Sequence, residues 1–312
     1  MSKKKYDIRR SDRIFVWSLR FFAFALFTLL LSIGAFLFIG ALPSIKHFGL
    51  SFIFKSTWDP VSDVFSALPV IYGTLCSSFL ALLIAAPLSI GVALFLNEFV
   101  PKKISSFLGF LVEMLAAIPS VVYGLWGVFV LAPFLREYVE PFLQTFFGFL
   151  PMFSGPIYGV GMLAAGIILS IMITPTISSI CKEIFKSIPR YQREAAMALG
   201  ATRWETMKIS VLKSSVTGIY GAVFLGLGRA LGETMAVTMI IGNKSEISTS
   251  LFSPAQTMAS LIANEYAEAA SELHLSSMLE IGLILFLITL VVNALARFIV
   301  QKSQKKGASR GH

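Results

Sequence analysis

Two charged residues lie deep inside an otherwise uncharged, apolar run. Between 214 and 243, Arg229 and Glu233 are the only Asp, Glu, Lys or Arg residues. A charge at the centre of a lipid bilayer costs about 2.5–3.5 kcal/mol, so Arg229 is expected to face the protein interior or a water-filled path. Glu233 follows one helical turn later, on the same face. Two interpretations stay open: an Arg229–Glu233 ion pair that joins two helices, or a guanidinium fork presented to a translocating oxyanion.

Three further residues are assigned to the same path. Glu113 is the only charged residue between 104 and 135, and we expect Arg20 or interfacial water beside it. Ser120 and Tyr123 follow within one to three helical turns. Tyr123 fits equally well as an interfacial anchor or as a ring that lines a gate.

The composition of the chain is that of a membrane protein. Its 312 residues are 56% hydrophobic and only 14% charged, whereas soluble chains carry about 25% charged residues. Several uncharged runs reach the roughly 17–25 residues that a membrane-spanning helix needs, and none shows the alternation of a β-barrel strand. The sequence therefore predicts an all-α integral membrane protein. Six spans are expected, near 18–42, 70–96, 104–134, 157–180, 214–242 and 278–299.

Several residues are expected to shape these spans. Proline inside a helix removes a hydrogen bond and promotes a kink or break. The prolines concerned are Pro87, Pro119 and Pro175. Small residues allow close helix packing, which is the default explanation for the glycines of the third and fifth spans. These glycines are Gly124, Gly127, Gly226, Gly228 and Gly232. The apolar segment 141–156 contains several helix breakers and is expected to be an external loop or a re-entrant piece.

The distribution of basic residues predicts the orientation. With six spans both chain ends lie on one side, and placing them in the cytoplasm puts 21 of the 26 Lys and Arg residues on that side. Cytoplasmic loops are enriched in Lys and Arg, so we expect both termini in the cytoplasm. Most of the net charge of +9 then reflects topology.

Enzyme and metal chemistry find little support in the sequence. Cys76 and Cys181 border different spans and are expected to be small buried residues, not a disulfide. The three histidines are scattered, and no cluster of His, Cys or carboxylates has metal-ligand or catalytic spacing. We expect no enzymatic activity in this chain.

The segment between the fourth and fifth spans carries the most specific pattern. Pro189 starts it, residues 192–199 favour a helix, and Gly200 stands where a helix would end in a left-handed cap. These features predict a short helix parallel to the membrane. Its alanines would allow the close approach of a partner surface.

This segment resembles the EAA loop of the binding-protein-dependent ABC importers, in which Glu-Ala-Ala and a later Gly precede Ile-x-Leu-Pro. The matching positions are Glu194, Ala195, Ala196, Gly200 and Leu212. Ser210 and Lys213 stand where the family has Ile and Pro. The resemblance implies that the helix docks on a separate ATPase subunit. The chain has no Gly-Lys-Ser or Gly-Lys-Thr phosphate loop, so ATP and Mg would be bound by that partner and no cofactor by this chain.

Three more segments resemble the phosphate-specific members of this family, in particular their C-type permease subunit. They are residues 116–127, 228–237 and 258–267. The resemblance implies a type I ABC importer permease fold, a location in the bacterial inner membrane and translocation of inorganic phosphate by alternating access. It also implies a homologous A-type permease subunit, two ATPase subunits and an extracytoplasmic phosphate-binding protein. A permease for sulfate or molybdate and an ATP-independent secondary transporter stay as alternatives.

The chemistry of the two charged residues suggests a division of labour, and the order of the spans suggests a domain plan. Hydrogen phosphate carries a hydroxyl that can donate to a carboxylate, so Glu233 would disfavour fully deprotonated oxyanions while balancing Arg229. The permease domain is expected at 64–300, after a first span and outer loop at 18–63. Basic tails are expected at 1–17 and 301–312.

Overall fold

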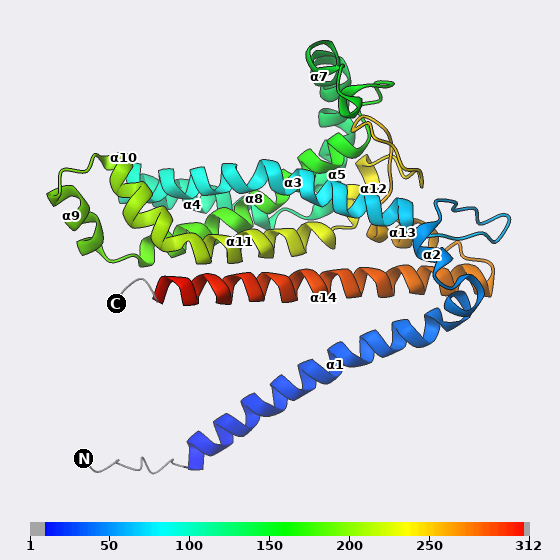
Figure 1. Cartoon of the computed structure of the whole chain (residues 1–312), viewed down its shortest axis with the longest axis horizontal. Helices are drawn as coiled ribbons and strands as arrows, with labels where there is room; N and C mark the ends of the chain where they lie inside the picture. Colours follow the sequence, from blue (N-terminus) through cyan, green and yellow to red (C-terminus); the bar gives the residue numbers. More distant parts are fainter. Residues whose placement is uncertain (1–9, 309–312) are drawn as a thin grey trace.

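The computed structural model describes residues 10–308, and almost all of them are helical (Figure 1). The long helices are α1 (Arg10–Phe48), α3 (Leu68–Leu94), α4 (Lys102–Ala117), α8 (Met162–Ser187), α11 (Lys213–Leu231) and α14 (Glu272–Ala308). The short helices are α2 (Ser51–Phe54), α5 (Ser120–Trp126), α6 (Ala132–Phe134), α7 (Glu140–Phe147), α9 (Arg190–Ala198), α10 (Arg203–Thr206), α12 (Met235–Ile240) and α13 (Met258–Glu265). Stretches of π-helix extend or join them at η1 (Phe95–Phe99), η2 (Gly127–Leu131), η3 (Leu135–Val139) and η5 (Met207–Leu212), and η4 (Pro151–Phe153) is a 3₁₀ turn.

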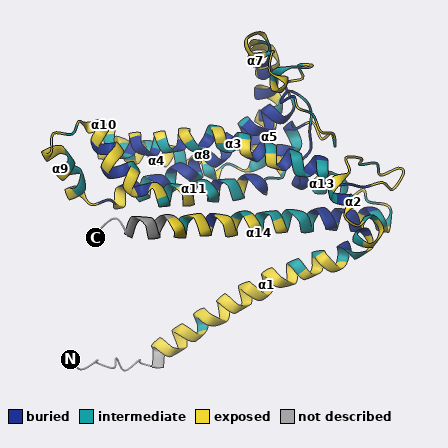
Figure 2. Ribbon diagram, viewed as in Figure 1, coloured by how far each residue is buried: buried dark blue, intermediate teal, exposed yellow. Residues whose placement is uncertain are grey.

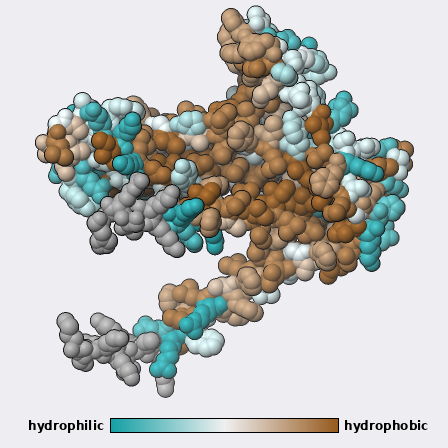
Figure 3. All heavy atoms as spheres, in the orientation of Figure 1, coloured by the Kyte–Doolittle hydropathy of each residue, from teal (hydrophilic) through white to brown (hydrophobic). Residues whose placement is uncertain are grey.

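Six helical segments of the described chain are long and apolar enough to cross a membrane, which is the number predicted. The third of them is Ser120–Phe147 and not the expected 104–134. An apolar band covers the middle of the molecule, and hydrophilic residues gather at the end that carries α9 and at the opposite end, which carries α13 (Figure 3). We call these the α9 end and the α13 end. The described parts of α1 and α14 both have their outer termini on the α9 side (Figure 1).

Helix α8 is the centre of the bundle. It is the most buried of the six segments, because α3, α4 and α11 all pack against it. Gly166 permits part of this contact, since a Cβ there would lie 2.5 Å from Leu80 Cδ2 of α3. In the absence of a hydrophobic driving force within lipid, such close packing of small residues is what holds membrane helices together.

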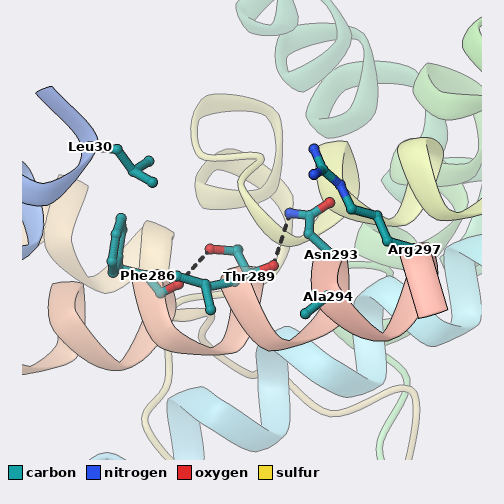
Figure 4. Close-up of a pocket in the computed structure, with 7 residues that line it drawn as sticks. Leu30, Phe286, Thr289, Asn293, Ala294 and Arg297 are labelled. Carbon is teal, nitrogen blue, oxygen red and sulfur yellow. Dashed lines mark hydrogen bonds between the residues drawn. The ribbon is translucent and has the colours of Figure 1, made fainter. Parts of the chain in front are cut away.

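Helix α1 stands apart from this bundle. Near the α13 end it packs on α14, where Ser276 Oγ accepts a hydrogen bond from the Ser44 N–H at 2.9 Å. Towards its N-terminus α1 diverges from α14 and is almost wholly exposed (Figure 2). A cleft of about 460 Å³ opens between the two helices, and Leu30, Phe286 and Arg297 are among the residues that line it (Figure 4).

The third and fifth spans are broken, which corrects the continuous helices expected at 104–134 and 214–242. Helix α4 ends at Ala117 and α5 starts at Ser120, while α11 ends at Leu231 and α12 starts at Met235. Of the three prolines expected to kink or break helices, Pro119 alone interrupts one; Pro87 and Pro175 lie inside α3 and α8. The residue before a proline is driven out of the helical region, and Ile118 is indeed extended, with ψ at 129°.

The segment after α5 forms an arm that projects from the α13 end (Figure 1). It continues in helical form through η2, α6 and η3 to the end of α7 at Phe147. The expected loop at 141–156 is therefore helical in its first half. Its second half contains the short turn η4 and Gly155, whose φ of +114° needs a glycine.

Candidate substrate pathway and coupling helix

Tyr123 lies at the break between α4 and α5 and supplies a hydrogen bond across it. Pro119 has no N–H, so the Leu115 carbonyl lacks the donor that a continuous helix would supply and accepts only a long backbone bond from the Ile118 N–H, at 3.4 Å. The Tyr123 hydroxyl donates to that carbonyl at 2.8 Å. Because Tyr123 is buried, this bond joins α5 to the end of α4 in a water-poor setting. Ser120 starts α5 one turn earlier and is half-buried beside the break.

Glu233 lies in the second break and not on a helix shared with Arg229. Its Oε1 atom accepts a hydrogen bond from the Ala236 N–H at 3.4 Å, near the start of α12. The Glu233 N–H donates to the Ala230 carbonyl at 3.3 Å as α11 ends. Among the described residues, the ion pairs do not include Arg229 with Glu233. The ion-pair interpretation thus finds no support among the recorded pairs, and the continuous helix that a shared face requires ends at Leu231.

The two broken spans pack against each other, and glycines allow the close contact. Helix α5 packs against α12, and a Cβ on Gly124 would come within 2.5 Å of Met239 Sδ. A Cβ on Gly127 would lie 2.8 Å from Ile240 Cδ1. Gly226 is similarly tight against Ile177 of α8, so the packing explanation is confirmed for these three. Gly228 differs, since beyond its chain neighbours and the nearby backbone of α11 no atom of the described chain lies within 4 Å of the Cβ it would carry.

Arg229 is exposed near the end of α11, close to the break between α11 and α12. Its Nη1 atom donates to Thr176 Oγ1 of α8 at 3.3 Å, and its charge is close enough to the Tyr123 phenol to interact with it. The side chain is exposed, and no other hydrogen bond to it is recorded within the described chain. Arg229 therefore has donors free for a ligand, next to the residue Gly228 that leaves space.

Glu113 lies elsewhere. It is exposed on α4 and lines a small cavity whose other residues include Gly109 and Lys182 of α8. Lys182 crosses directly over Gly109, since a Cβ there would lie 2.1 Å from Lys182 Nζ. The expected neighbour Arg20 belongs to α1, whose N-terminal half diverges from the bundle (Figure 1). The structure thus groups Arg229, Tyr123 and Thr176, and places Glu113 with Lys182.

Two clefts of the described chain contain none of these pathway residues. One is the cleft between α1 and α14, and the other, of about 490 Å³, is an apolar groove beside Tyr72 and Cys76. Arg229 instead lies exposed on α11, one helical turn after the exposed Leu225. Within the described chain, Arg229 is exposed and lines neither of these two clefts.

The predicted short helix is α9, and its C-terminal cap is confirmed. Gly200 has φ of +86°, the left-handed conformation that favours glycine. The Gly200 N–H donates to the Met197 carbonyl at 2.9 Å, and the Ala201 N–H donates to the Ala196 carbonyl at 3.2 Å. These two bonds form a Schellman motif. None of the residues of α9 is buried, so Glu194, Ala195 and Ala196 are available to a partner.

Sequence reasoning missed the residues that fix α9 in place. Arg193 bonds to Glu98 of η1, and its Nη2 atom lies 2.8 Å from Glu98 Oε1. Ser210, which departs from the family pattern, donates from Oγ to the Gln192 carbonyl at 3.0 Å. Thr202 and Glu205 form a capping box at the start of α10. The Thr-x-x-Glu spacing was a readable signal for this box, whereas no local signal links Arg193 to Glu98.

Comparison with known proteins decides the family. A family model described as "Binding-protein-dependent transport system inner membrane component" matches residues 85–305. The chain belongs to this family. The permease is 45% identical over 308 residues to the phosphate transport system permease protein PstC of Mesorhizobium japonicum, covering 96% of this chain and 94% of that protein. It is 46% identical to the PstC protein of Pasteurella multocida, with coverage of 95% and 93%.

Solved structures confirm the predicted type I ABC importer fold of the permease. One neighbour is a chain of a bacterial alginate ABC transporter, solved in complex with a periplasmic protein that binds an alginate pentasaccharide. It aligns with a TM-score of 0.61 at 18% identity, and the alignment covers 95% of this permease and 96% of that chain. An inward-facing chain of the MetNI methionine ABC transporter aligns with a TM-score of 0.57 at 15% identity, covering 79% and 99%. At these identities the likeness concerns the fold alone.

Proposed function

We propose that this permease forms half of the translocation path of an ATP-driven importer and carries inorganic phosphate into the cytoplasm. The observation that carries the proposal is Arg229, an exposed arginine with free donors at the junction of two broken spans. The PstC relatives, which are named as phosphate transport permeases, support phosphate as the substrate.

The chemistry around Arg229 suits an oxyanion that must be bound weakly and released. The guanidinium offers several planar donors to phosphate oxygens, and Thr176 steadies it through one long bond of 3.3 Å. Glu233 uses Oε1 to cap α12, and its carboxylate would accept the hydroxyl of hydrogen phosphate. Sulfate has no such hydroxyl at neutral pH, so Glu233 would select against it.

The second half of the path would come from a homologous A-type permease subunit. Arg229 is exposed on a bundle surface rich in apolar side chains, and a second permease covering that surface would close a path around it. An extracytoplasmic phosphate-binding protein would deliver phosphate at the α13 end. The permease would then alternate between outward and inward access.

Two ATPase subunits would supply the energy, one beneath each permease. Helix α9 offers them an unburied surface, and apolar side chains are exposed on it and on the loop after it; Leu199 is 89% exposed. An exposed apolar surface of this kind indicates a protein partner. The α9 end would lie in the cytoplasm, as the excess of basic residues predicts. The permease itself would hydrolyse nothing.

Co-purification from native membranes, followed by an ATPase assay in proteoliposomes, tests this proposal. We expect the permease to bring a second permease and an ATPase with it. ATP hydrolysis should rise when phosphate-loaded binding protein is added and not when sulfate-loaded binding protein is added. Stimulation by the sulfate-loaded protein would assign another oxyanion, and uptake without any ATPase would indicate a secondary transporter.

A further inference from the structure

The Arg193 side chain connects three elements at the α9 end. It belongs to α9, and it donates from Nε and Nη2 to Glu98 Oε1 of η1, at 3.2 and 2.8 Å. It also donates from Nη1 to the Ile188 carbonyl at 2.8 Å and from Nη2 to the Phe185 carbonyl at 2.9 Å, where α8 ends. One guanidinium therefore satisfies acceptors from the ends of two spans.

The chemistry of this junction explains why an arginine stands there. The last carbonyls of a helix have no partner within the helix and carry partial negative charge, so a cation at the end of α8 is favourable. Glu98 adds a full negative charge, and only 17% of the Arg193 side chain and 16% of the Glu98 side chain are exposed. The fork geometry of arginine reaches all three acceptors at once, which a lysine ammonium on its single stem cannot do.

Helix α9 has few other attachments. It buries no residue, so apolar packing does not fix its position. Its second polar attachment is the bond from Ser210 Oγ of η5 to the Gln192 carbonyl. Arg193 and Ser210 thus tie α9 to three spans: α3 through η1, α8, and α11 through η5.

Helix α8 leads from this junction to the candidate pathway. Phe185, whose carbonyl Arg193 holds, and Thr176, which bonds Arg229, are nine residues apart on the same helix. At 1.5 Å per residue this is about 14 Å along a continuous helix. A movement of α9 that is carried by Arg193 therefore reaches the contact of Arg229 without crossing a flexible loop.

We propose that Arg193 is a positioning residue that transmits movement of the ATPase from α9 to the spans, with Glu98 as its counter-ion. The proposal rests on the proposed function, because it takes α9 as the surface on which the ATPase docks. Without the Arg193 fork, α9 moves with the ATPase while α3 and α8 lag behind. ATP is then hydrolysed with little transport.

The test is the ratio of phosphate taken up to ATP hydrolysed, measured on the same proteoliposomes containing the complete transporter. We expect Arg193→Lys to lower this ratio about tenfold while ATP hydrolysis persists, since charge is kept but the fork is lost. Glu98→Gln should lower it about threefold, because the amide oxygen still accepts a hydrogen bond. Lys103→Gln is the matched control at the same end: Lys103 is exposed on α4, lies outside α9 and has no ion pair recorded in the described chain, so the ratio should stay unchanged.

Two results would overturn the proposal. One is a normal ratio in both Arg193→Lys and Glu98→Gln. The other is an equal loss of uptake and hydrolysis in complexes that remain assembled, which would assign Arg193 to docking or activation of the ATPase. If the Arg193 variant does not assemble, the ratio measured for Glu98→Gln tests the proposal by itself, since this substitution leaves α9 unaltered. Absence of an ATPase or of phosphate uptake in the unmodified complex would instead refute the proposed function.

Discussion

Arg193 of α9 and Arg229 of α11 differ in how firmly their side chains are fixed by hydrogen bonds and burial. Arg193 makes four hydrogen bonds to Glu98, Phe185 and Ile188 and is mostly buried. Arg229 makes one recorded bond of 3.3 Å to Thr176 and is exposed. A group that transmits force must be fixed on both sides, whereas a group that binds and releases a substrate must keep its donors free. The difference agrees with the two proposals, coupling for the first arginine and substrate contact for the second.

Removal of the free arginine should have the largest effect. Arg229→Gln loses the charge-assisted bonds to an oxyanion, each worth about 1.5–3 kcal/mol, so phosphate uptake should fall roughly 10–100-fold. Arg297→Gln is the matched control, because Arg297 also lies in a span but lines the cleft beside α1 (Figure 4). Equal uptake by both variants, measured in proteoliposomes, would show that Arg229 does not contact the substrate.

The cap of α9 gives the next largest effect. Gly200→Val places a branched residue at φ of +86°, at a cost of about 1–2 kcal/mol, and should weaken ATPase binding and uptake roughly tenfold. Gly200→Asn should retain most function, because asparagine tolerates this conformation. Apart from the two chain neighbours of Gly200, no atom of the described residues lies within 4 Å of the added Cβ, so crowding by them does not explain a loss. Equal binding by the two variants in a pull-down with the ATPase would exclude a role for the cap.

A substitution of Glu233 tests whether this carboxylate selects phosphate over sulfate. Glu233→Gln removes the charge but keeps an oxygen that can cap α12. We expect phosphate uptake to fall severalfold and sulfate, supplied at high concentration, to inhibit it more strongly than in the unmodified protein. Competition assays measure this directly. Unchanged phosphate uptake and unchanged inhibition would refute the selectivity role of Glu233.

The smallest effects concern the junction that supports Arg229. Gly124→Ala brings a Cβ to 2.5 Å from Met239 Sδ and 3.3 Å from Ala236 Cα, and should destabilise the permease by about 1–3 kcal/mol. Gly221→Ala has open space and should be neutral or stabilising by about 1 kcal/mol, since alanine favours a helix. Thermal unfolding of the purified permease in detergent separates the two. A lower melting temperature for Gly221→Ala than for Gly124→Ala would contradict the packing described here.

The sequence predicted those parts of the molecule that depend on local pattern. Apolar runs identified six spans, and the Pro189 and Gly200 signals identified α9 and its left-handed cap, because both follow from backbone preferences of single residues. The family resemblance supplied the fold, which the structural comparisons confirm.

The parts that the sequence did not reveal depend on tertiary contacts. Pro87, Pro119 and Pro175 look alike in the sequence, yet Pro119 alone ends a helix, where the Tyr123 hydroxyl takes over its missing hydrogen bond. The break at Gly232 separated Glu233 from Arg229 although four residues predict a shared face. Glu98 and Arg193 lie 95 positions apart, so only the folded bundle brings them together.

Accessibility of the position next to Arg229 tests the central claim most directly. Gly228→Cys, in a chain whose Cys76 and Cys181 are replaced by serine, places a thiol where the described chain leaves open space. In the assembled transporter we predict that a charged, water-soluble thiol reagent modifies this cysteine during turnover and blocks uptake, and that phosphate-loaded binding protein slows the modification. The contrary result is a thiol that stays unmodified in the assembled complex while a Lys55→Cys control, on the exposed loop after α2, reacts. It would show that Arg229 faces lipid or a packed interface and not a phosphate path.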